Sequence, residues 1–276
     1  MAKRYTRDQV LSRLHVTINK KKPILAVGAG SGLVARCADL AGADLIVVYC
    51  TGRARHMGIG TAIIGDPNTI TLGMSHEISH VVKETPMIAG IQGTDPTRDM
   101  KDLLTQFASY NYSGVINYPS VTHYGEMYAE IREASGRGYS KEKDTLLLAR
   151  SMGFATVTYA YRQKDAEHFA DAVDVIIPHI GWTAGGLSGS KYAEKIPLKE
   201  AAERVEEMAR VARKVNPEVI VLCHGGPIVG PKETEYIYKH SSAQGFVGGS
   251  STERIPIEKA IMGIVNEFKS VSTNRE

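Results

Sequence analysis

The hydrophobic residues of the chain fall into short continuous runs, separated by longer stretches with helical periodicity. Runs such as ILAVGA, DLIVVY and EVIVLC are apolar at consecutive positions, which is typical of parallel strands that are covered on both faces. The strands of a half-exposed sheet would instead alternate apolar and polar residues. The pattern predicts eight strands, at Ile24–Ala29, Asp44–Tyr49, Met87–Ile91, Gly114–Tyr118, Ala155–Ala160, Val173–His179, Glu218–Cys223 and Gly245–Gly248.

Between these runs, apolar residues recur every three to four positions, which is the period of an amphipathic helix. Eight strand–helix units at a mean spacing of roughly 30 residues favour an α/β fold of the (β/α)8 TIM-barrel type, and a doubly wound open sheet is the alternative. The helices are expected at Leu33–Leu40, His76–Glu84, Arg98–Ser109, Tyr124–Ala134, Lys141–Met152, Asp165–Ala170, Leu198–Val215, Glu233–Lys239 and Ile257–Lys269.

One more helical segment, residues 7–20, precedes the first strand, and Thr6 is positioned to be its N-cap. In a barrel, such an extra helix would close the end at which the strands begin. Neither a linker nor a low-complexity tract interrupts the chain. We therefore expect a single TIM-barrel domain over residues 1–276, with residues 1–22 closing its bottom.

Composition and charge exclude several classes of protein. The net charge of +3, from 33 basic and 30 acidic residues, is too balanced to indicate a nucleic-acid or membrane-surface partner. The apolar runs are far shorter than a membrane span, and the first ten residues lack the apolar core of a signal peptide. Three widely spaced cysteines form no zinc or disulfide pattern and indicate a reducing, cytoplasmic location.

In TIM barrels the active site forms at the C-terminal ends of the strands, here called the mouth. Glycine and serine residues follow the first, seventh and eighth predicted strands, and backbone N–H groups in such loops can hold a phosphate or carboxylate. Alternatively, Ser251 and Thr252 only cap a short helix. The candidate anion-binding residues in these loops are Gly30, Ser31, Gly225, Gly226, Gly248, Gly249, Ser250 and Ser251.

Several polar side chains should also face the mouth. His179 and His224 each follow an apolar run and can act as general acid or base, although a histidine at a strand end can equally be structural. A second set could donate hydrogen bonds to a developing enolate oxygen. It consists of Gln92, Asn117 and Tyr159.

Charged residues beside the mouth leave more than one interpretation open. A long predicted loop begins at Arg53 and reaches about Ser75. Its first residues include Arg53, Arg55 and His56, which suit a carboxylate or phosphate ligand or are simply a charged surface cluster. Glu253 and Arg254 follow the last glycines and either reach the mouth or pair with each other. A second glycine-rich loop, residues 181–190, has the composition of a mobile lid.

Two apparent motifs carry less weight. His76, Glu77 and His80 match the H-E-x-x-H spacing of zinc proteases, but the helix between the second and third strands packs outside a barrel, away from the mouth. The glycines at 28, 30 and 32 lack the third glycine position of a dinucleotide fingerprint, and Asp44 opens the next strand instead of closing it. We therefore expect neither zinc nor NAD.

Four segments resemble the phosphoenolpyruvate hydrolase-like proteins, also called the TIM-barrel signal-transduction family. They are residues 24–55, INYPSV at 116–121, CHGGPI at 223–228 and GFVGGSSTERIPIE at 245–258. The resemblance covers nearly the whole chain and implies a barrel fold and homo-oligomers. Residues 30–46 are also similar, more distantly, to the opening of the phosphoenolpyruvate mutase/isocitrate lyase superfamily, whose members act on 2-oxo acids through a magnesium-stabilised enolate.

Magnesium is possible only by that distant resemblance. The superfamily holds it with a D-x-D-x-G-Y-G motif, whereas this chain has Gln92 to Asp95 as Q-G-T-D after the third strand and no D-x-D nearby; the lyase signature K-K-C-G-H is missing as well. Without paired carboxylates a hard divalent cation lacks its usual ligands. No metal-binding residues are therefore assigned, and the cofactor stays open.

These observations lead to one principal hypothesis and two rivals. The protein would be an enzyme that acts on a small anionic 2-oxo or enol acid by hydrolysis or by C–C or C–P cleavage. The first rival is a metabolite-binding sensor or signalling scaffold that performs no chemistry. The second rival, a lyase with a Schiff-base lysine, is weakened because no lysine falls inside or just after a predicted strand.

Overall fold

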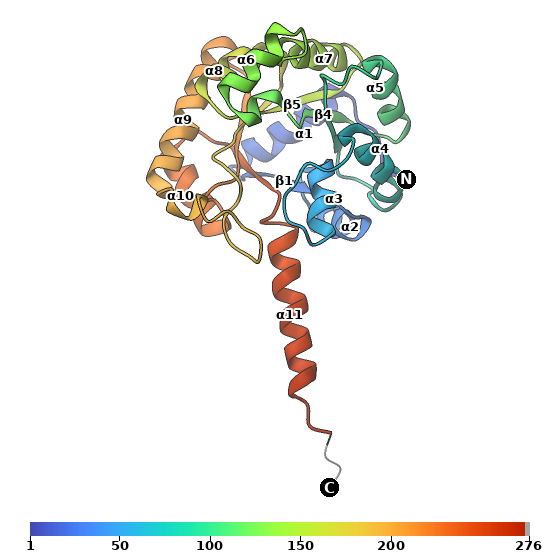
Figure 1. Ribbon diagram of the computed structural model, residues 1–276, viewed down its shortest axis with the longest axis vertical. Helices are drawn as coiled ribbons and strands as arrows, with labels where there is room; N and C mark the ends of the chain where they lie inside the picture. Colours follow the sequence, from blue (N-terminus) through green and yellow to red (C-terminus); the bar gives the residue numbers. More distant parts are fainter. Residues whose placement is uncertain (274–276) are drawn as a thin grey trace.

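The computed structural model describes residues 1–273, and within them eight parallel strands close into a barrel in sequence order (Figure 1). The predicted barrel is thus confirmed, and the open sheet is wrong. The last three residues of the predicted domain, 274–276, lie outside the described residues. The strands are β1 (Ile24–Gly28), β2 (Leu45–Val48), β3 (Met87–Ile91), β4 (Gly114–Asn117), β5 (Ala155–Ala160), β6 (Val175–Pro178), β7 (Ile220–Cys223) and β8 (Gly245–Gly248).

Helices surround the barrel, and the predicted segments correspond to most of them (Figure 1). The α-helices are α1 (Arg7–Asn19), α2 (Gly32–Leu40), α3 (Cys50–His56), α4 (Pro67–Val81), α5 (Met100–Ser109), α6 (Glu126–Ala134), α7 (Tyr139–Ser151), α8 (Gln163–Phe169), α9 (Leu198–Val215), α10 (Pro231–His240) and α11 (Arg254–Ser270). Three short 3-10 helices are η1 (Val121–Tyr124), η2 (Ala170–Ala172) and η3 (Ala193–Lys195). No helix within residues 1–273 is long and apolar enough to cross a membrane.

The long loop predicted from Arg53 to about Ser75 is wrong. Residues 50–56 form the short helix α3, and α4 begins at Pro67, nine residues before the predicted start at His76. The start of α4 has a local cause, because the Asp66 side chain accepts a hydrogen bond from the Thr69 N–H and proline is favoured in the first helical turn. Neither helix shows a clear apolar stripe.

The helix α1 begins with a capping box formed by Thr6 and Gln9, as the sequence indicated for Thr6. Its buried residues Val10 and Leu14 pack into the same cluster as inward-facing strand residues such as Ile24. Because Ile24 starts β1, α1 lies against the end of the barrel at which the strands begin.

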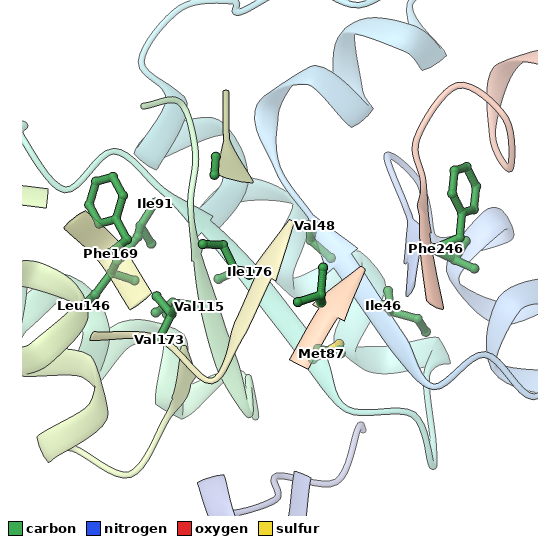
Figure 2. Packing of buried hydrophobic residues seen from close by; sticks show 14 of the residues in the cluster. Ile46, Val48, Met87, Ile91, Val115, Leu146, Phe169, Val173, Ile176 and Phe246 are labelled. Atoms are coloured by element: carbon green, nitrogen blue, oxygen red, sulfur yellow. The ribbon is translucent and has the colours of Figure 1, made fainter. Parts of the chain in front are cut away.

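The core has two layers, as the alternation of side chains along a strand requires. One cluster fills the barrel, and the other lies between the strands and the surrounding helices. Figure 2 shows part of the outer layer, in which Leu146 of α7 and Phe169 of α8 join Val115 and Ile176 of the strands. These contacts hold the strands in place, so that the residues after each strand converge at the mouth.

Candidate functional site

A pocket of about 30 Å³ lies at the mouth of the barrel. Its walls come from the ends of six strands, β2 and β4 to β8, from α3, and from the loops after α3 and β6, so residues far apart in the chain meet there. The lining residues are Tyr49, Thr51, Arg55, Thr61, Tyr118, Tyr159, His179, Trp182, Thr183, His224, Gly249 and Ser250.

A buried ion pair forms one wall of the pocket. Glu253 accepts a hydrogen bond from Nε of Arg55 at 2.6 Å and a further one from Nη2 of the same guanidinium. Its other oxygen accepts the Gly30 N–H at 2.5 Å and lies 3.4 Å from Nε2 of His56. Burial by itself disfavours both charges, but each charge stabilises the other, so the pKa of Arg55 is raised and the pKa of Glu253 is lowered. Both residues are therefore ionised at neutral pH.

Two histidines also line the pocket, with ring centroids 4.7 Å apart. Burial lowers the pKa of His224 to about 4 and the pKa of His179 well below its usual value. The His224 charge would also repel a charge on His179. At neutral pH both imidazoles are therefore uncharged, and each carries a single N–H.

Hydrogen bonds to the backbone assign opposite tautomers to the two rings. Nδ1 of His224 lies 2.7 Å from the Val247 carbonyl oxygen, which can only accept, so Nδ1 carries the proton and Nε2 keeps a lone pair. Nδ1 of His179 accepts the Gly181 N–H at 3.1 Å, so its proton is on Nε2. The pocket therefore contains one imidazole Nε2 acceptor and one imidazole Nε2–H donor.

Three tyrosines also line the pocket. The Tyr118 ring lies 5.1 Å from Tyr49 and 5.6 Å from Tyr159, measured between centroids. The Tyr159 ring is also 5.2 Å from His179 and 5.1 Å from His224. The buried Tyr159 hydroxyl forms no well-oriented hydrogen bond within the described residues. The nearby Tyr49 side chain nevertheless helps to raise its pKa. Burial raises that pKa well above its usual value, so Tyr159 keeps its proton and can donate it in a hydrogen bond.

Five of the residues selected from the sequence line the pocket: His179, His224, Tyr159, Gly249 and Ser250. The Ser250 hydroxyl lies 3.2 Å from that of Thr61, on the loop after α3. Glu253 stands directly behind the pocket through its hydrogen bonds with Arg55, and Gly30 in turn donates its N–H to Glu253. The Glu253–Arg254 pair, one of the two open alternatives, is absent from the described residues, since Arg254 bonds to Glu258 instead.

Arg53 lies outside the pocket, and Arg55 lines it instead. The Arg53 side chain is 46% exposed and stands 3.9 Å from Glu77 on α4. Because α3 is a helix, residues two positions apart point in nearly opposite directions. In the loop predicted for this segment nothing distinguishes the two arginines, and only the helix shows that Arg55, not Arg53, faces the pocket.

The remaining loop residues support the pocket from behind. The Gly226 N–H donates to the Gly181 carbonyl at 2.7 Å, and both Gly225 and Gly226 have positive φ angles that favour glycine. The Gly248 carbonyl accepts from the Thr252 hydroxyl. Ser31 caps α2, and the buried Ser251 hydroxyl has no hydrogen-bond partner within residues 1–273.

Gln92 and Asn117 are bonded to other parts of the protein. The Gln92 backbone exchanges hydrogen bonds with the side chain of Asn68. Asn117 donates to Glu142 at 3.0 Å, and this fully buried carboxylate also accepts from the Ser120 hydroxyl and the Val121 N–H. Neither residue is part of the pocket lining, so their proposed contact with a substrate remains untested.

The buried Glu142 makes stability depend on pH. Burial raises its pKa from 4.5 to about 7, despite its three hydrogen bonds. Between these pH values the carboxyl ionises in the unfolded chain but not in the folded one, so the free energy of unfolding should fall by about 3 kcal/mol as pH rises from 4.5 to 7. Urea denaturation across this range should show that the Glu142→Gln variant lacks this slope. The exposed variant Glu130→Gln should keep it, and an unchanged slope in Glu142→Gln would contradict the assignment.

The H-E-x-x-H residues lie on α4, outside the barrel as expected, and they are exposed. Glu77 accepts the Gly32 N–H at 2.6 Å, so it fixes the start of α2. Among the described residues, no group of three or more His, Cys, Asp or Glu side chains could hold a metal ion.

The residues at the mouth do not fit magnesium either. Asp95, the only acidic residue directly after β3, bonds to Asn68, Thr97 and Arg98. Glu253 is committed to Arg55, and the lining itself contains no carboxylate within residues 1–273. A hard divalent cation prefers several oxygen ligands, usually carboxylates. The donor set here consists of hydroxyls, imidazoles and a guanidinium.

Comparison with known proteins places the chain in a family. The sequence profile of the phosphoenolpyruvate hydrolase-like family matches residues 9–271. The chain belongs to the phosphoenolpyruvate hydrolase-like family. This agrees with the resemblance of the four sequence segments, and each of the four supplies at least one pocket residue.

Two tomato (Solanum lycopersicum) proteins share 39% identity with the chain. They are the ToMV susceptible protein tm-1(GCR26), over 269 residues, and the ToMV resistance protein Tm-1(GCR237), over 272 residues. The alignments cover 95% and 96% of this chain but 35% and 36% of the tomato proteins. The chain thus spans about a third of the length of these curated relatives.

Solved structures with the same fold include enzymes of the phosphoenolpyruvate mutase/isocitrate lyase superfamily. The 2,3-dimethylmalate lyase of that superfamily aligns with a TM-score of 0.61 at 15% identity, covering 99% of this chain and 92% of the lyase. Oxaloacetate acetylhydrolase with its product oxalate aligns with a TM-score of 0.62 at 13% identity, covering 99% of this chain and 91% of the hydrolase. Phosphonopyruvate hydrolase with oxalate and magnesium aligns with a TM-score of 0.60 at 17% identity, covering 95% of this chain and 85% of the hydrolase. At such low identity the likeness establishes the fold.

Proposed function

We propose that the protein is an enzyme that cleaves a small anionic 2-oxo or enol acid, with the histidine pair as its acid–base machinery. The observation that carries this proposal is the pair of neutral, oppositely protonated imidazoles in one pocket with a buried arginine. The fold is shared with enzymes whose names refer to phosphonopyruvate and oxaloacetate, which supports this class of substrate.

The anionic group of the substrate would bind at the wall formed by Arg55, Gly249 and Ser250. Arg55 supplies a permanent positive charge, and the Ser250 hydroxyl can donate a hydrogen bond. Glu253 holds the guanidinium through two of its nitrogens, so its orientation is set before the substrate arrives. Such preorganisation removes part of the entropic cost of binding.

The two histidines and Tyr159 would act on the reacting atoms. For phosphonopyruvate, the His224 lone pair takes a proton from water, the hydroxide attacks phosphorus, and the C–P bonding electrons form the enolate of pyruvate. Hydrogen bonds from the His179 Nε2–H and the Tyr159 hydroxyl stabilise the enolate oxygen. The proton on His224 then passes to the enolate carbon, which gives pyruvate and phosphate and restores the starting tautomer.

A second candidate function is a metabolite-binding sensor or scaffold that performs no chemistry. Two observations favour it: the described part of the pocket lacks the carboxylates of the magnesium-dependent superfamily, and the pocket is small at about 30 Å³. A single water needs roughly 10–15 Å³ by a comparable measure. The loop at 181–190 must therefore open before a 2-oxo acid can enter. The name of one tomato relative, which refers to virus resistance and not to an enzyme activity, also suits the sensor.

Phosphorus NMR of the purified protein with phosphoenolpyruvate or phosphonopyruvate tests the proposal. Parallel samples contain added magnesium or EDTA. We expect turnover in both samples, because the histidines need no metal. Turnover only with magnesium would contradict the metal-free mechanism, and line broadening without turnover would favour the sensor.

We also propose that the protein acts in the cytoplasm as a homo-oligomer, with a small anionic metabolite as its ligand. The three cysteines are free in the described structure, which suits a reducing compartment.

A further inference from the structure

A continuous row of aromatic rings leads from the pocket onto the outer surface of the barrel. It begins at Trp182, which lines the pocket and is nevertheless 40% exposed. The centroid of the His123 ring lies 5.7 Å from that of Trp182, and the centroid of Tyr124 lies 5.3 Å from that of His123. Tyr128 follows at 5.1 Å from Tyr124. We call these four side chains the aromatic strip, and its outer members Tyr124 and Tyr128 are 54% and 41% exposed.

Three different elements supply the strip, and hydrogen bonds fix its inner part. Trp182 lies on the loop after β6, His123 and Tyr124 belong to η1, and Tyr128 belongs to α6. The Trp182 Nε1–H donates to Nε2 of His123 at 3.3 Å, so the two rings are held together. The buried Glu142 also accepts the first N–H of η1 at 2.8 Å. The inner part of the strip is therefore ordered before a ligand arrives, which lowers the entropic cost of binding.

The strip differs from ordinary apolar exposure at a protein surface. Single exposed apolar residues, such as Leu40 with 77%, are normal and need no functional explanation. A contiguous exposed apolar patch more often marks a ligand-binding groove or an interaction surface. Here the patch consists of aromatic rings and continues into the pocket through Trp182, so one ligand can occupy both. Aromatic rings gain a specific contact when they stack on, or point an edge at, another ring.

The charges near the strip indicate which kind of aromatic group fits. Burial lowers the pKa of His123 and raises the pKa of Tyr124, so both rings are uncharged at neutral pH. Beside α6, the cations Lys164 and Arg162 already pair with acidic side chains, among them Glu126 at 3.4 and 3.7 Å. The phosphates of a nucleotide would meet these acidic side chains. An uncharged aromatic group therefore fits better.

We propose that the substrate is a 2-oxo acid with an uncharged aromatic group, which lies on the aromatic strip while the acid end occupies the pocket. The inference rests on the proposed function, because it takes the pocket beside Arg55 as the site of the acid. At about 30 Å³, the pocket has no room for an aromatic ring as well. A substituent that leaves the pocket beside Trp182 meets His123 first and Tyr124 next.

Isothermal titration calorimetry with three acids of increasing length tests this assignment. They are pyruvate, phenylpyruvate and 3-(biphenyl-4-yl)pyruvate, which carry no, one and two aromatic rings. We expect the Kd to fall by about tenfold with each ring, because each ring buries apolar area and gains an aromatic contact. The saturated analogue 3-cyclohexylpyruvate should bind less tightly than phenylpyruvate. Equal affinity of these two acids would contradict an aromatic site.

The variant Tyr124→Ala locates the second ring of the longest acid. It should weaken the binding of biphenylylpyruvate about tenfold, to the level of phenylpyruvate, and leave the Kd of pyruvate unchanged. Tyr192→Ala is the matched control, since this tyrosine lies beyond the same loop as Trp182 and is 75% exposed. It should change none of the three Kd values. Full affinity of Tyr124→Ala for biphenylylpyruvate would overturn the strip as the binding surface.

Failure of the strip and failure of the proposed function give different results. If pyruvate binds and the added rings leave the Kd unchanged, the strip assignment is wrong while the acid site stands. If none of the three acids binds, the acid site itself is wrong, and both proposals fall together. Biphenyl-4-ylmethanol keeps the rings but lacks the acid, so it should bind far more weakly than biphenylylpyruvate. Equal binding of these two compounds would overturn the assignment of an aryl-substituted 2-oxo acid.

Discussion

Replacing Glu253 by glutamine should lower the free energy of unfolding by about 3–5 kcal/mol, the typical cost of leaving one charge of a buried pair without its partner. The side chains of Glu253 and its partner Arg55 are both almost fully buried, so water cannot take the place of the lost carboxylate. The amide can still accept the Gly30 N–H, which separates the charge effect from the loss of that hydrogen bond. Urea denaturation at pH 7 measures the change.

Glu235→Gln is the matched control, since this residue makes an exposed pair with Lys239 on α10 and should leave stability unchanged. The double variant Arg55→Met with Glu253→Gln should recover part of the loss, because no buried charge then remains unpaired. If the double variant were less stable than Glu253→Gln by the full effect of Arg55→Met alone, the two substitutions would be additive and the residues would act independently. That result would contradict the pairing.

Replacing His224 by alanine should reduce kcat by about 10²- to 10⁴-fold on whichever acid the protein turns over, since general acid–base groups contribute this much. His179→Ala should have a loss of similar size, because it removes the donor to the developing oxyanion. His76→Ala, on the exposed surface of α4, is the control and should retain full activity. Steady-state kinetics at equal concentrations of folded protein measures kcat for the three variants. Unimpaired turnover in both His179→Ala and His224→Ala would refute the mechanism.

The dependence on pH gives an independent check on the same pair. His224 accepts a proton only while it is neutral, and burial lowers its pKa to about 4. We therefore expect kcat/KM to stay level from pH 8 to about 5 and to fall as pH drops through 4. An ordinary exposed histidine would cause this fall near its usual pKa of about 6.5. A decline centred near 6.5 would mean that His224 is not the base.

Much of the site could be predicted from the sequence because strand ends are local features. His179, His224 and Tyr159 lie at the C-terminal ends of strands, and the barrel brings such ends together. Tyr49 and Tyr118 end the predicted apolar runs as well, so the same rule would have found them. Arg55 could not be found in this way, because it lies within a short helix that has no apolar stripe to mark it.

The sequence by itself determined the family, the barrel and the position of the mouth. The hydrophobic periodicity of each strand and helix is a property of neighbouring residues, and the order of these elements along the chain then indicates the barrel. Only the tertiary structure decided which side chains share the pocket. Arg55 and Glu253 are 198 positions apart, and no local pattern links them. The histidine tautomers were likewise decided by backbone groups of Gly181 and Val247, whose positions depend on how the loops pack. The path of α11, which projects from the barrel (Figure 1), was likewise decided by the tertiary structure.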